Sequence, residues 1–373
     1  AEHDSTQVSR LRRAGAIPIG KTNLPELGST AFTKNRLFGV TRNPWHLAKT
    51  PGGSSGGSSA AVAAGIVPCA PGGDGGGSIR IPAAYTGLVG LKATFGRIPR
   101  GRFGFRDWTD TISRGPLARS VRDTALWVDA VAGYDPFDPD SLQHPGYRFT
   151  DGLEDAPRGL RIAYLATLGY GHVAPDVRRV VEDAVGALGR ALGIAIDAPT
   201  VHLTDVGMAW AFINAFQTYG RLAPLLDTHR DDFGRGFLKG VELGGRLGAA
   251  DIARCQQERY RLNGEVADLF ARYDLLLTPT CPTTAFAAGG PMPDVIDGQK
   301  LASPLHAVAF TYPFNMTGHP AISLPAGLGD DGLPIGLQIV AERGEDRMLL
   351  RAAQAFETAR PYPRWPAEPQ GTP

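Results

Sequence analysis

The sequence of 373 residues predicts an α/β fold in which helices pack in layers on a sheet, and two observations lead to this prediction. Short apolar segments that are typical of buried strands alternate along the chain with longer segments whose apolar residues recur at helical spacing. Hydrophobic residues make up 43% of the chain and charged residues 20%, which is ordinary for a globular protein with a sizeable core.

The first expected element is a helix near the N-terminus. Asp4 or Ser5 can cap it by accepting a hydrogen bond from its first turn, and Val8, Leu11 and Ala14 share one of its faces. The elements expected after it, as far as residue 165, are a strand at 16–19, a helical segment at 58–67, a buried strand at 68–70, a helix opened by a capping box at 120–123 and ended near Gly133, and a strand at 160–165.

A second long helix is expected to begin at Pro175, because proline fits the first helical turn, where its missing N–H group would be unpaired anyway. Val177, Val181, Ala184 and Leu188 repeat along it at helical spacing. The remaining expected elements are a strand at 194–196, a helix at 252–273, a strand at 274–278, two strands at 320–325 and 334–340 with a turn at 329–332, and a closing helix at 346–359.

Charge and cysteine content exclude several classes of function. The formal net charge is +1, from 38 basic and 37 acidic residues, and nothing indicates a surface for nucleic acid or a membrane. No apolar run reaches the length of about 18 residues that predicts a membrane-spanning helix. The three cysteines lie far apart, so neither a metal site nor a disulfide framework is indicated. A reducing compartment, the cytoplasm, fits this cysteine content best.

Residues 15–22 match the phosphate-loop pattern G-x-x-x-x-G-K-T, but we reject this interpretation. Such a loop follows a strand, opens a helix and offers free backbone N–H groups to the phosphates. Here a helix precedes the segment, Pro18 removes one N–H group, and Pro25 disfavours a helix directly afterwards. We expect a buried strand followed by a turn instead.

Residues 52–59 are all glycine or serine, a composition that is typical of a flexible linker. The run leads directly into the apolar residues 60–67, which favours a helix start that offers serine hydroxyls and backbone N–H groups to a polar site. It also fits the nucleophile pattern G-x-S-x-G centred on Ser54 or Ser55. That pattern requires a buried strand just before it, and residues 43–51 are a poor candidate, so a Ser-His-Asp hydrolase stays a weak alternative.

A second cluster, residues 72–80, places three consecutive glycines before Ser78. Glycines can turn several backbone N–H groups toward one point and allow a substrate carbonyl to approach, as an oxyanion hole requires. A tight loop with a surface serine is the alternative, and this loop alone does not decide between the two. Asp74 and Arg80 flank the serine; they either pair and brace the loop or are unrelated surface charges.

Together, the two clusters and the helix between them resemble the signature region of the amidase signature family. The motif Gly-x-Asp-x-Gly-Gly-Ser-Ile-Arg ends at Arg80, and the separation between Ser54 and Ser78 is the one found in that family. Other segments that are similar to the family are residues 14–23, 87–92, 314–323 and 332–338. The resemblance covers almost the whole chain, with the signature region at about 20–100 and a variable middle at about 140–300.

The resemblance implies one domain over residues 1–373 with an α/β/α fold, in which helices cover a large, twisted, mixed sheet of mostly parallel strands. It implies a Ser–Ser–Lys triad and neither a metal nor a cofactor. Ser78 would attack the amide carbonyl to form an acyl-enzyme, and Ser54, after a cis peptide bond, would relay the proton. The other implied site residues are the oxyanion-hole glycines Gly75, Gly76 and Gly77 with the N–H group of Ser78, the supporting residues Ser55, Asp74 and Arg80, and the channel-lining residues Gly28, Ser29 and Thr30.

The sequence departs from the family at its catalytic base. The family implies an unprotonated lysine well before the relay serine, at a distance that falls upstream of Ala1. None of the lysines in the chain fits the motif of that base: Lys21, Lys34, Lys49, Lys92, Lys239 and Lys300. We therefore expect an N-terminally incomplete family member that is inactive, or nearly so, on its own.

The resemblance leaves three functions open. The leading hypothesis is a free-standing amidase that acts on small or aryl amides, without nucleic acid or membrane partners and with a homodimer as one option. The second is the amide-hydrolysing component of a glutamine-dependent tRNA amidotransferase, which would need partner subunits, although we find no glutamine-binding pattern of that component in the C-terminal third. The third is a non-catalytic relic that binds ligands on an enzyme fold.

Overall fold

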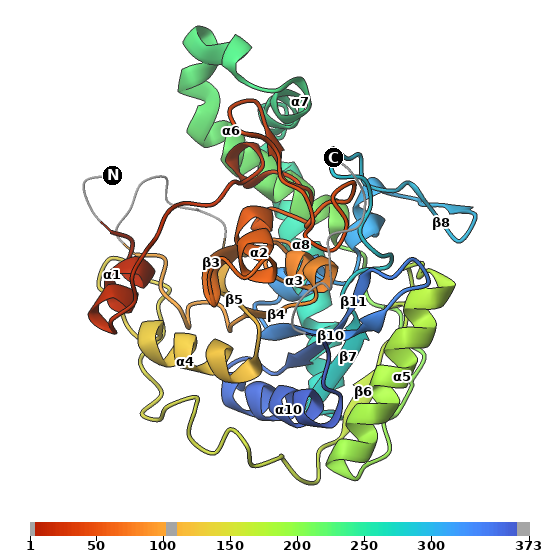
Figure 1. Cartoon of the computed structure of the whole chain (residues 1–373). Coiled ribbons are helices and arrows are strands. Elements are labelled where there is room, and N and C mark those ends of the chain that lie inside the picture. The colour runs from red at the N-terminus through yellow and green to blue at the C-terminus, as the bar shows by residue number, and fades with distance from the viewer. Residues whose placement is uncertain (1–3, 102–109, 364–373) are drawn as a thin grey trace.

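The computed structural model describes residues 4–101 and 110–363, and at its centre lies a mixed sheet of seven strands (Figure 1). In order across the sheet the strands are β3 (Cys69–Asp74), β5 (Ser113–Ala118), β4 (Val89–Lys92), β10 (Ala321–Leu328), β11 (Pro334–Ala341), β7 (Leu275–Pro279) and β6 (Ile162–Tyr164). Every residue of β11 is buried, which requires cover on both faces of the sheet. The α/β class that the sequence predicts is confirmed.

The expectation of mostly parallel strands is wrong. Among the described strands of this sheet, only β6 and β7 pair in parallel, and every other neighbouring pair is antiparallel. A strand–helix–strand unit does place β3 and β4 in the same direction, but β5 inserts between them and pairs antiparallel with both. The tight turn between β10 and β11 makes these two strands an antiparallel hairpin. Sequence periodicity does not reveal which strands insert between others.

Two groups of helices cover the sheet. The helices of the described residues are α1 (Thr6–Arg13), α2 (Gly56–Ala63), α3 (Arg80–Thr86), α4 (Val121–Val131), α5 (Pro175–Leu192), α6 (Gly207–His229), α7 (Arg235–Gly244), α8 (Ala249–Phe270), α9 (Tyr312–Met316) and α10 (Asp346–Ala359). Helices α4, α5 and α10 pack together on the sheet, and α2 and α3 form the second group. Helices α3 and α10 both contact β11, all of whose residues are buried.

Helices α6 and α7 pack on each other and project from the body of the molecule (Figure 1). The N-terminal half of α6 returns toward the sheet, where it meets α8 and α9. Short elements complete the fold: the two-stranded sheets β1 (Lys34–Asn35) with β2 (Gly39–Val40) and β8 (Val295–Ile296) with β9 (Gln299–Lys300), and the 3-10 turns Glu26–Gly28, Arg230–Asp232 and Pro304–Val308.

Several predicted element boundaries are confirmed. The N-cap of α4 is Ser120, whose Oγ accepts a hydrogen bond from the N–H group of Asp123 at 3.1 Å. Pro175 occupies the first turn of α5, and α10 spans the residues expected of the closing helix. In α1, Ser5 is the N-cap as expected, but the buried residue is Gln7 and the predicted face residue Ala14 is exposed.

Two expected strands do not form. Residues 16–19 are irregular, and the side chains of Ile17 and Ile19 are 85% and 67% exposed. Residues 194–196 follow the C-cap of α5 and reach β6 only through a single bridge between Asp197 and Ala163. Apolar content makes each segment a strand candidate, but a strand also requires a neighbour for its backbone hydrogen bonds, and the described residues supply none for 16–19.

Candidate active site

The glycine–serine run at 52–59 is a packed part of the core and not a linker. The peptide bond between Gly53 and Ser54 is cis, as the family resemblance implies. Helix α2 begins two residues later, and its first residues are buried. A Cβ atom at Gly57 would lie 2.3 Å from the carbonyl oxygen of Asn23, so only glycine fits there. No described strand directly precedes this run, which leaves the nucleophile-elbow pattern without its structural context.

The two clusters meet in space. Strand β3 ends at Asp74, the loop 75–79 follows, and α3 begins at Arg80. The N–H group of Ser55 donates a hydrogen bond to the carbonyl oxygen of Ser78 at 3.1 Å, which joins the two clusters directly. Ser54 and Ser78 are both half-buried. The two segments are therefore in contact, and the relay role of Ser54 stays a prediction.

Every carbonyl group from residue 74 to residue 78 is held by the protein. Three side chains donate to the first three oxygens: Asn315 Nδ2 to that of Asp74 at 2.7 Å, Trp210 Nε1 to that of Gly75 at 2.6 Å, and Thr311 Oγ1 to that of Gly76 at 2.6 Å. Two backbone N–H groups donate to the others: that of Ile81 to the oxygen of Gly77 at 2.7 Å, and that of Ser55 to the oxygen of Ser78 at 3.1 Å. Carbonyl oxygens would repel a developing oxyanion, and here each of them is already engaged by a donor of the protein.

The N–H groups of the same loop divide into two kinds. Within the described part of the chain, the N–H groups of Gly75, Gly76 and Ser78 make no hydrogen bond to the protein. The N–H group of Gly77 donates to Asp74 Oδ1 at 2.8 Å. The loop therefore offers three unengaged donors next to a serine hydroxyl, while the fourth predicted donor, at Gly77, is occupied in this structure.

Asp74 and Arg80 form the ion pair that the sequence left undecided. Arg80 Nη2 lies 2.9 Å from Asp74 Oδ1, and both side chains are fully buried. Burial by itself raises the pKa of Asp74, but Arg80, Asn315 and Lys92 more than offset it and lower that pKa to about 2. Arg80 also donates to Gln338 Oε1 at 2.7 Å and to Asn315 Oδ1 at 2.6 Å, so every guanidinium nitrogen donates at least one hydrogen bond.

The remaining predicted residues lie around the two serines. The Oγ atom of Ser55 lies near the backbone of Gly73 at the end of β3, with its oxygen 3.3 Å from that residue's nitrogen. Gly28 has a φ of +76°, and a Cβ atom there would lie 3.6 Å from Ser54 Oγ. The carbonyl oxygen of Thr30 packs against Gly53. The segment with Gly28, Ser29 and Thr30 thus borders the relay serine, and its role as a channel lining stays a prediction.

Four residues at this site were missed by sequence reasoning. Asn315 lies in the recognised segment 314–323 but received no role, and Thr311 and Gln338 lie close to or inside recognised segments. Trp210 lies in the variable middle, where the sequence offered no signal. All four donate or accept hydrogen bonds at residues 74–80, here called the signature loop, from more than 100 residues away along the chain.

Lys92 on β4 is a fully buried titratable group near this network. Burial and the positive charge of Arg80 lower the pKa of Lys92 from 10.5 to about 7, although Asp74 and Asp346 oppose the shift. The Nζ atom of Lys92 donates to the carbonyl oxygen of Ala93 at 3.3 Å. No described hydrogen bond joins Lys92 to Ser54 or Ser78.

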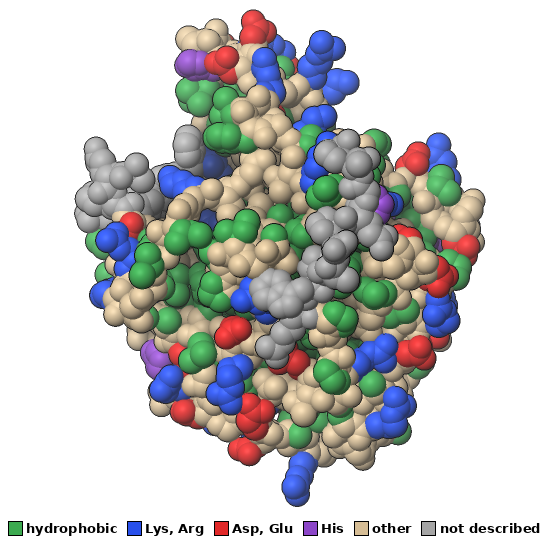
Figure 2. Space-filling model, in the orientation of Figure 1, with side chains coloured by type: hydrophobic (Ala, Val, Ile, Leu, Met, Phe, Trp, Pro, Cys, Tyr) green, Lys and Arg blue, Asp and Glu red, His purple; other side chains and the backbone are tan. Residues whose placement is uncertain are grey.

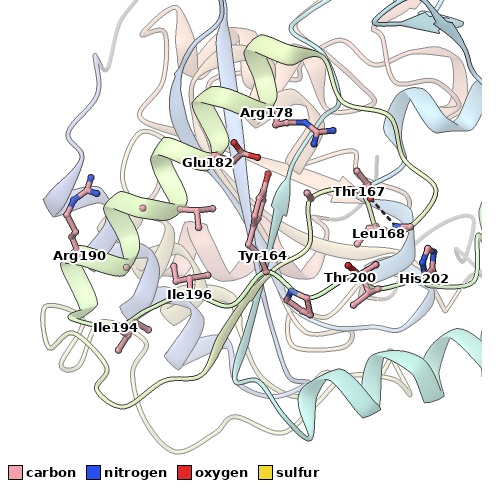
Figure 3. A pocket seen from close by; sticks show the side chains of 18 of the residues that line it. Tyr164, Thr167, Leu168, Arg178, Glu182, Arg190, Ile194, Ile196, Thr200 and His202 are labelled. Atoms are coloured by element: carbon pink, nitrogen blue, oxygen red, sulfur yellow. Dashed lines mark hydrogen bonds between the residues drawn. The ribbon is translucent and has the colours of Figure 1, made fainter.

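A groove of about 910 Å³ lies at the opposite edge of the sheet, between α5 and the segment 194–202 (Figure 3). Arg178, Glu182 and Arg190 stand along its α5 side as exposed charges. The hydroxyl of Tyr164 on β6 points toward Glu182 (Figure 3), and among the described residues it has no hydrogen-bond partner. Because β6 and β3 are the two edge strands, this groove is separate from the loop that carries Ser78.

Within residues 4–101 and 110–363, no group of three histidine, cysteine or acidic side chains is arranged to bind a metal ion. In the same residues, no helix has both the length and the apolar character needed to cross a membrane. Figure 2 shows hydrophobic side chains gathered on the face that carries α2 and β3, beneath the projecting helices α6 and α7.

Comparisons with known sequences place the chain among amide hydrolases. The family model described as Amidase matches residues 1–350. An acylamidase from Rhodococcus erythropolis is 38% identical, over 97% of this chain and 76% of the relative. A component of the Glutamyl-tRNA(Gln) amidotransferase from Thermus thermophilus is 39% identical, over 96% of this chain and 78% of the relative.

Comparisons with solved structures agree. A bacterial aryl acylamidase of the amidase signature family superposes with a TM-score of 0.90 at 33% identity, covering 100% of this chain and 79% of that structure. A 6-aminohexanoate cyclic dimer hydrolase complexed with substrate gives a TM-score of 0.85 at 34% identity, covering 97% of this chain and 79% of that structure. The chain belongs to the amidase signature family of amide-bond hydrolases.

Proposed function

We propose that this protein hydrolyses small-molecule amides through an acyl-enzyme on Ser78. The observation that supports this most directly concerns the loop 75–78. All of its carbonyl oxygens accept hydrogen bonds from the protein, whereas three of its N–H groups make none among the described residues. Ser78 Oγ attacks the amide carbonyl, and the carbonyl oxygen becomes an oxyanion that the N–H groups of Gly75, Gly76 and Ser78 stabilise.

Proton transfer completes the reaction. The proton of Ser78 passes through the hydroxyl of Ser54 to a base and then to the leaving nitrogen, so the C–N bond breaks and an amine or ammonia departs. Water then attacks the ester of Ser78 and releases the carboxylic acid. The base that the family resemblance implies is a lysine, and none of the lysines in residues 1–373 fits its motif.

The amide-hydrolysing component of a tRNA amidotransferase is the second candidate. The 39% identity to the Thermus thermophilus protein supports it. The two candidates differ in their need for partners, because a free-standing amidase hydrolyses simple amides as a purified single chain.

We also propose a reducing, cytoplasmic location, supported by the three free cysteines Cys69, Cys255 and Cys281.

The test is a panel of aryl and aliphatic amides, with glutamine included, assayed with the full-length gene product. We expect Ser78→Ala to abolish turnover and labelling by a serine-reactive fluorophosphonate. Ser54→Ala should lower kcat by about 100-fold or more, since proton relay commonly contributes that factor. Ser9→Ala on α1 is the matched control and should behave like the parent. Absence of both turnover and Ser78 labelling in the parent protein would favour the non-catalytic relic.

A further inference from the structure

The indole of Trp210 holds the signature loop from outside the signature region. Trp210 lies in the first turn of α6, and its Nε1–H group donates to the carbonyl oxygen of Gly75 at 2.6 Å. A Cβ atom at Gly76 would lie 2.4 Å from Cζ2 of the same ring, so the indole also covers the next residue of the loop. The ring therefore fixes both the direction and the position of the peptide between Gly75 and Gly76.

This peptide decides where one of the unengaged donors points. The carbonyl oxygen of Gly75 and the N–H group of Gly76 belong to the same planar trans peptide, so they point in opposite directions. With the oxygen bound to Trp210, the N–H group faces away from the indole. Both flanking residues are glycine, for which backbone rotation to the opposite orientation has little steric cost. A rotated peptide would present a carbonyl oxygen where the N–H group now lies.

The indole is itself held in place. Its ring stacks on Tyr312, with centroids 6.1 Å apart and an angle of 21° between the planes. The hydroxyl of Tyr312 donates to Asp205 Oδ1 at 3.0 Å, and His306 Nε2 lies 2.7 Å from Asp205 Oδ2. Asp205 lies two residues before α6 in the chain, so the same contacts that orient the ring also anchor the start of the helix.

We propose that Trp210 is a positioning residue for amide hydrolysis, which keeps the N–H group of Gly76 directed at the developing oxyanion. The inference rests on the proposed acyl-enzyme at Ser78. Trp210 acts through the loop and not by contact with the reacting atoms. Its effect belongs to the transition state, where the negative charge forms, and not to substrate binding.

The experiment separates the donor from the bulk of the ring. Trp210→Phe keeps an aromatic ring to stack on Tyr312 but removes the N–H donor. Trp210→His places Nε2 where the indole Nε1 lies, and its Nε2–H tautomer can donate to the carbonyl oxygen of Gly75, but the larger ring is lost. Trp45→Phe is the matched control, since Trp45 Nε1 donates to the carbonyl oxygen of Thr86 at 2.9 Å outside the loop.

In the full-length protein we expect Trp210→Phe to lower kcat about tenfold while KM stays within about twofold, a smaller loss than removal of a direct oxyanion donor. Trp210→His should retain more of kcat than Trp210→Phe, and Trp45→Phe should match the parent. All rates are measured well below the thermal midpoint of each variant. An unchanged kcat in Trp210→Phe, or a lower kcat in Trp210→His than in Trp210→Phe, would overturn the proposal.

The same experiment distinguishes this inference from the proposed function. If the parent protein neither turns over amides nor labels at Ser78, the proposed function is wrong and the role of Trp210 falls with it. If the parent is active and Ser78→Ala is inactive, the proposed function stands, and only the comparison of the two Trp210 variants decides the inference.

Discussion

Asp74 and Arg80 form a buried ion pair directly behind the residues that surround Ser78. Removing two charges from water costs more free energy than their attraction returns unless hydrogen bonds satisfy the remaining atoms. Here the carboxylate accepts from the N–H group of Gly77 and from Asn315, and the guanidinium donates to Gln338. The pair thus fixes the direction of the loop, and we assign it an orienting role more than a net stabilising one.

Substitution of Arg80 tests this assignment. Arg80→Gln leaves the carboxylate of Asp74 buried without its counter-charge, so we expect a loss of about 3–5 kcal/mol in the free energy of unfolding. Arg179→Gln is the control, because its ion pair with Asp330 is exposed and should contribute about 0–1 kcal/mol. Urea denaturation measures both. Equal, small losses in the two variants would contradict the assignment.

Lys92 gives the fold a pH dependence of its own. Burial and Arg80 lower its pKa from 10.5 to about 7, so between these values the unfolded chain carries a proton that the folded chain lacks. The contribution of Lys92 to stability therefore rises as pH increases from 7 to 10.5 and is constant below and above that window.

Lys92→Met removes this titration. We expect the unfolding free energy of the parent, relative to that of Lys92→Met, to increase steadily from about pH 7 to about pH 10 in urea denaturation. Lys34→Met, at an exposed lysine, controls for the change in net charge. If the difference in unfolding free energy between the parent and Lys92→Met does not vary with pH, the folded protein keeps this lysine charged.

At the scale of elements, the segment 16–19 shows the limit of apolar patterning. Its composition is that of a strand, yet Ile17 and Ile19 are exposed, whereas Ile322 on β10 and Ile339 on β11 are fully buried. The same residue type has opposite environments because β10 and β11 have neighbours on both sides in the sheet and residues 16–19 have none among the described residues.

We therefore predict opposite costs for the same substitution. Ile17→Ala and Ile19→Ala should each change the unfolding free energy of the 373-residue chain by less than about 0.5 kcal/mol. Ile322→Ala and Ile339→Ala should each cost about 2–5 kcal/mol, because they leave cavities in a packed core. Thermal or urea denaturation of the four variants decides. A cost of several kcal/mol at Ile17 would mean that the segment is packed in solution.

The helices were easier to predict than the sheet order. Ser120 is the N-cap of α4, and Pro175 lies in the first turn of α5, so each predicts a helix start from a few neighbouring residues. The insertion of β5 between β3 and β4 depends on pairings between distant segments, and no local pattern records them. The boundaries of α4, α5 and α10 were therefore predicted closely, whereas α6 and α7 were not expected and the mostly parallel arrangement was wrong.

At the scale of the whole molecule, none of the lysines in residues 1–373 fits the motif of the base that the family resemblance implies. We expect residues 1–373 on their own to show no more than trace turnover of aryl amides, because proton transfer from Ser78 through Ser54 lacks its base. A kcat measurement with one aryl amide tests this. Ordinary turnover would show that a group within these residues acts as the base.

The sequence by itself determined the α/β class, the glycine–serine clusters around Ser54 and Ser78, and the family to which they belong, because these features depend on local composition and spacing. Only the tertiary structure decided that Asp74 and Arg80 pair, that the N–H group of Gly77 is occupied, and that Trp210 binds the loop from 135 residues away. The physical reason is that composition and turn-forming residues act on their neighbours in the chain. The direction of a loop peptide depends instead on a distant donor, which tertiary packing places next to the carbonyl oxygen.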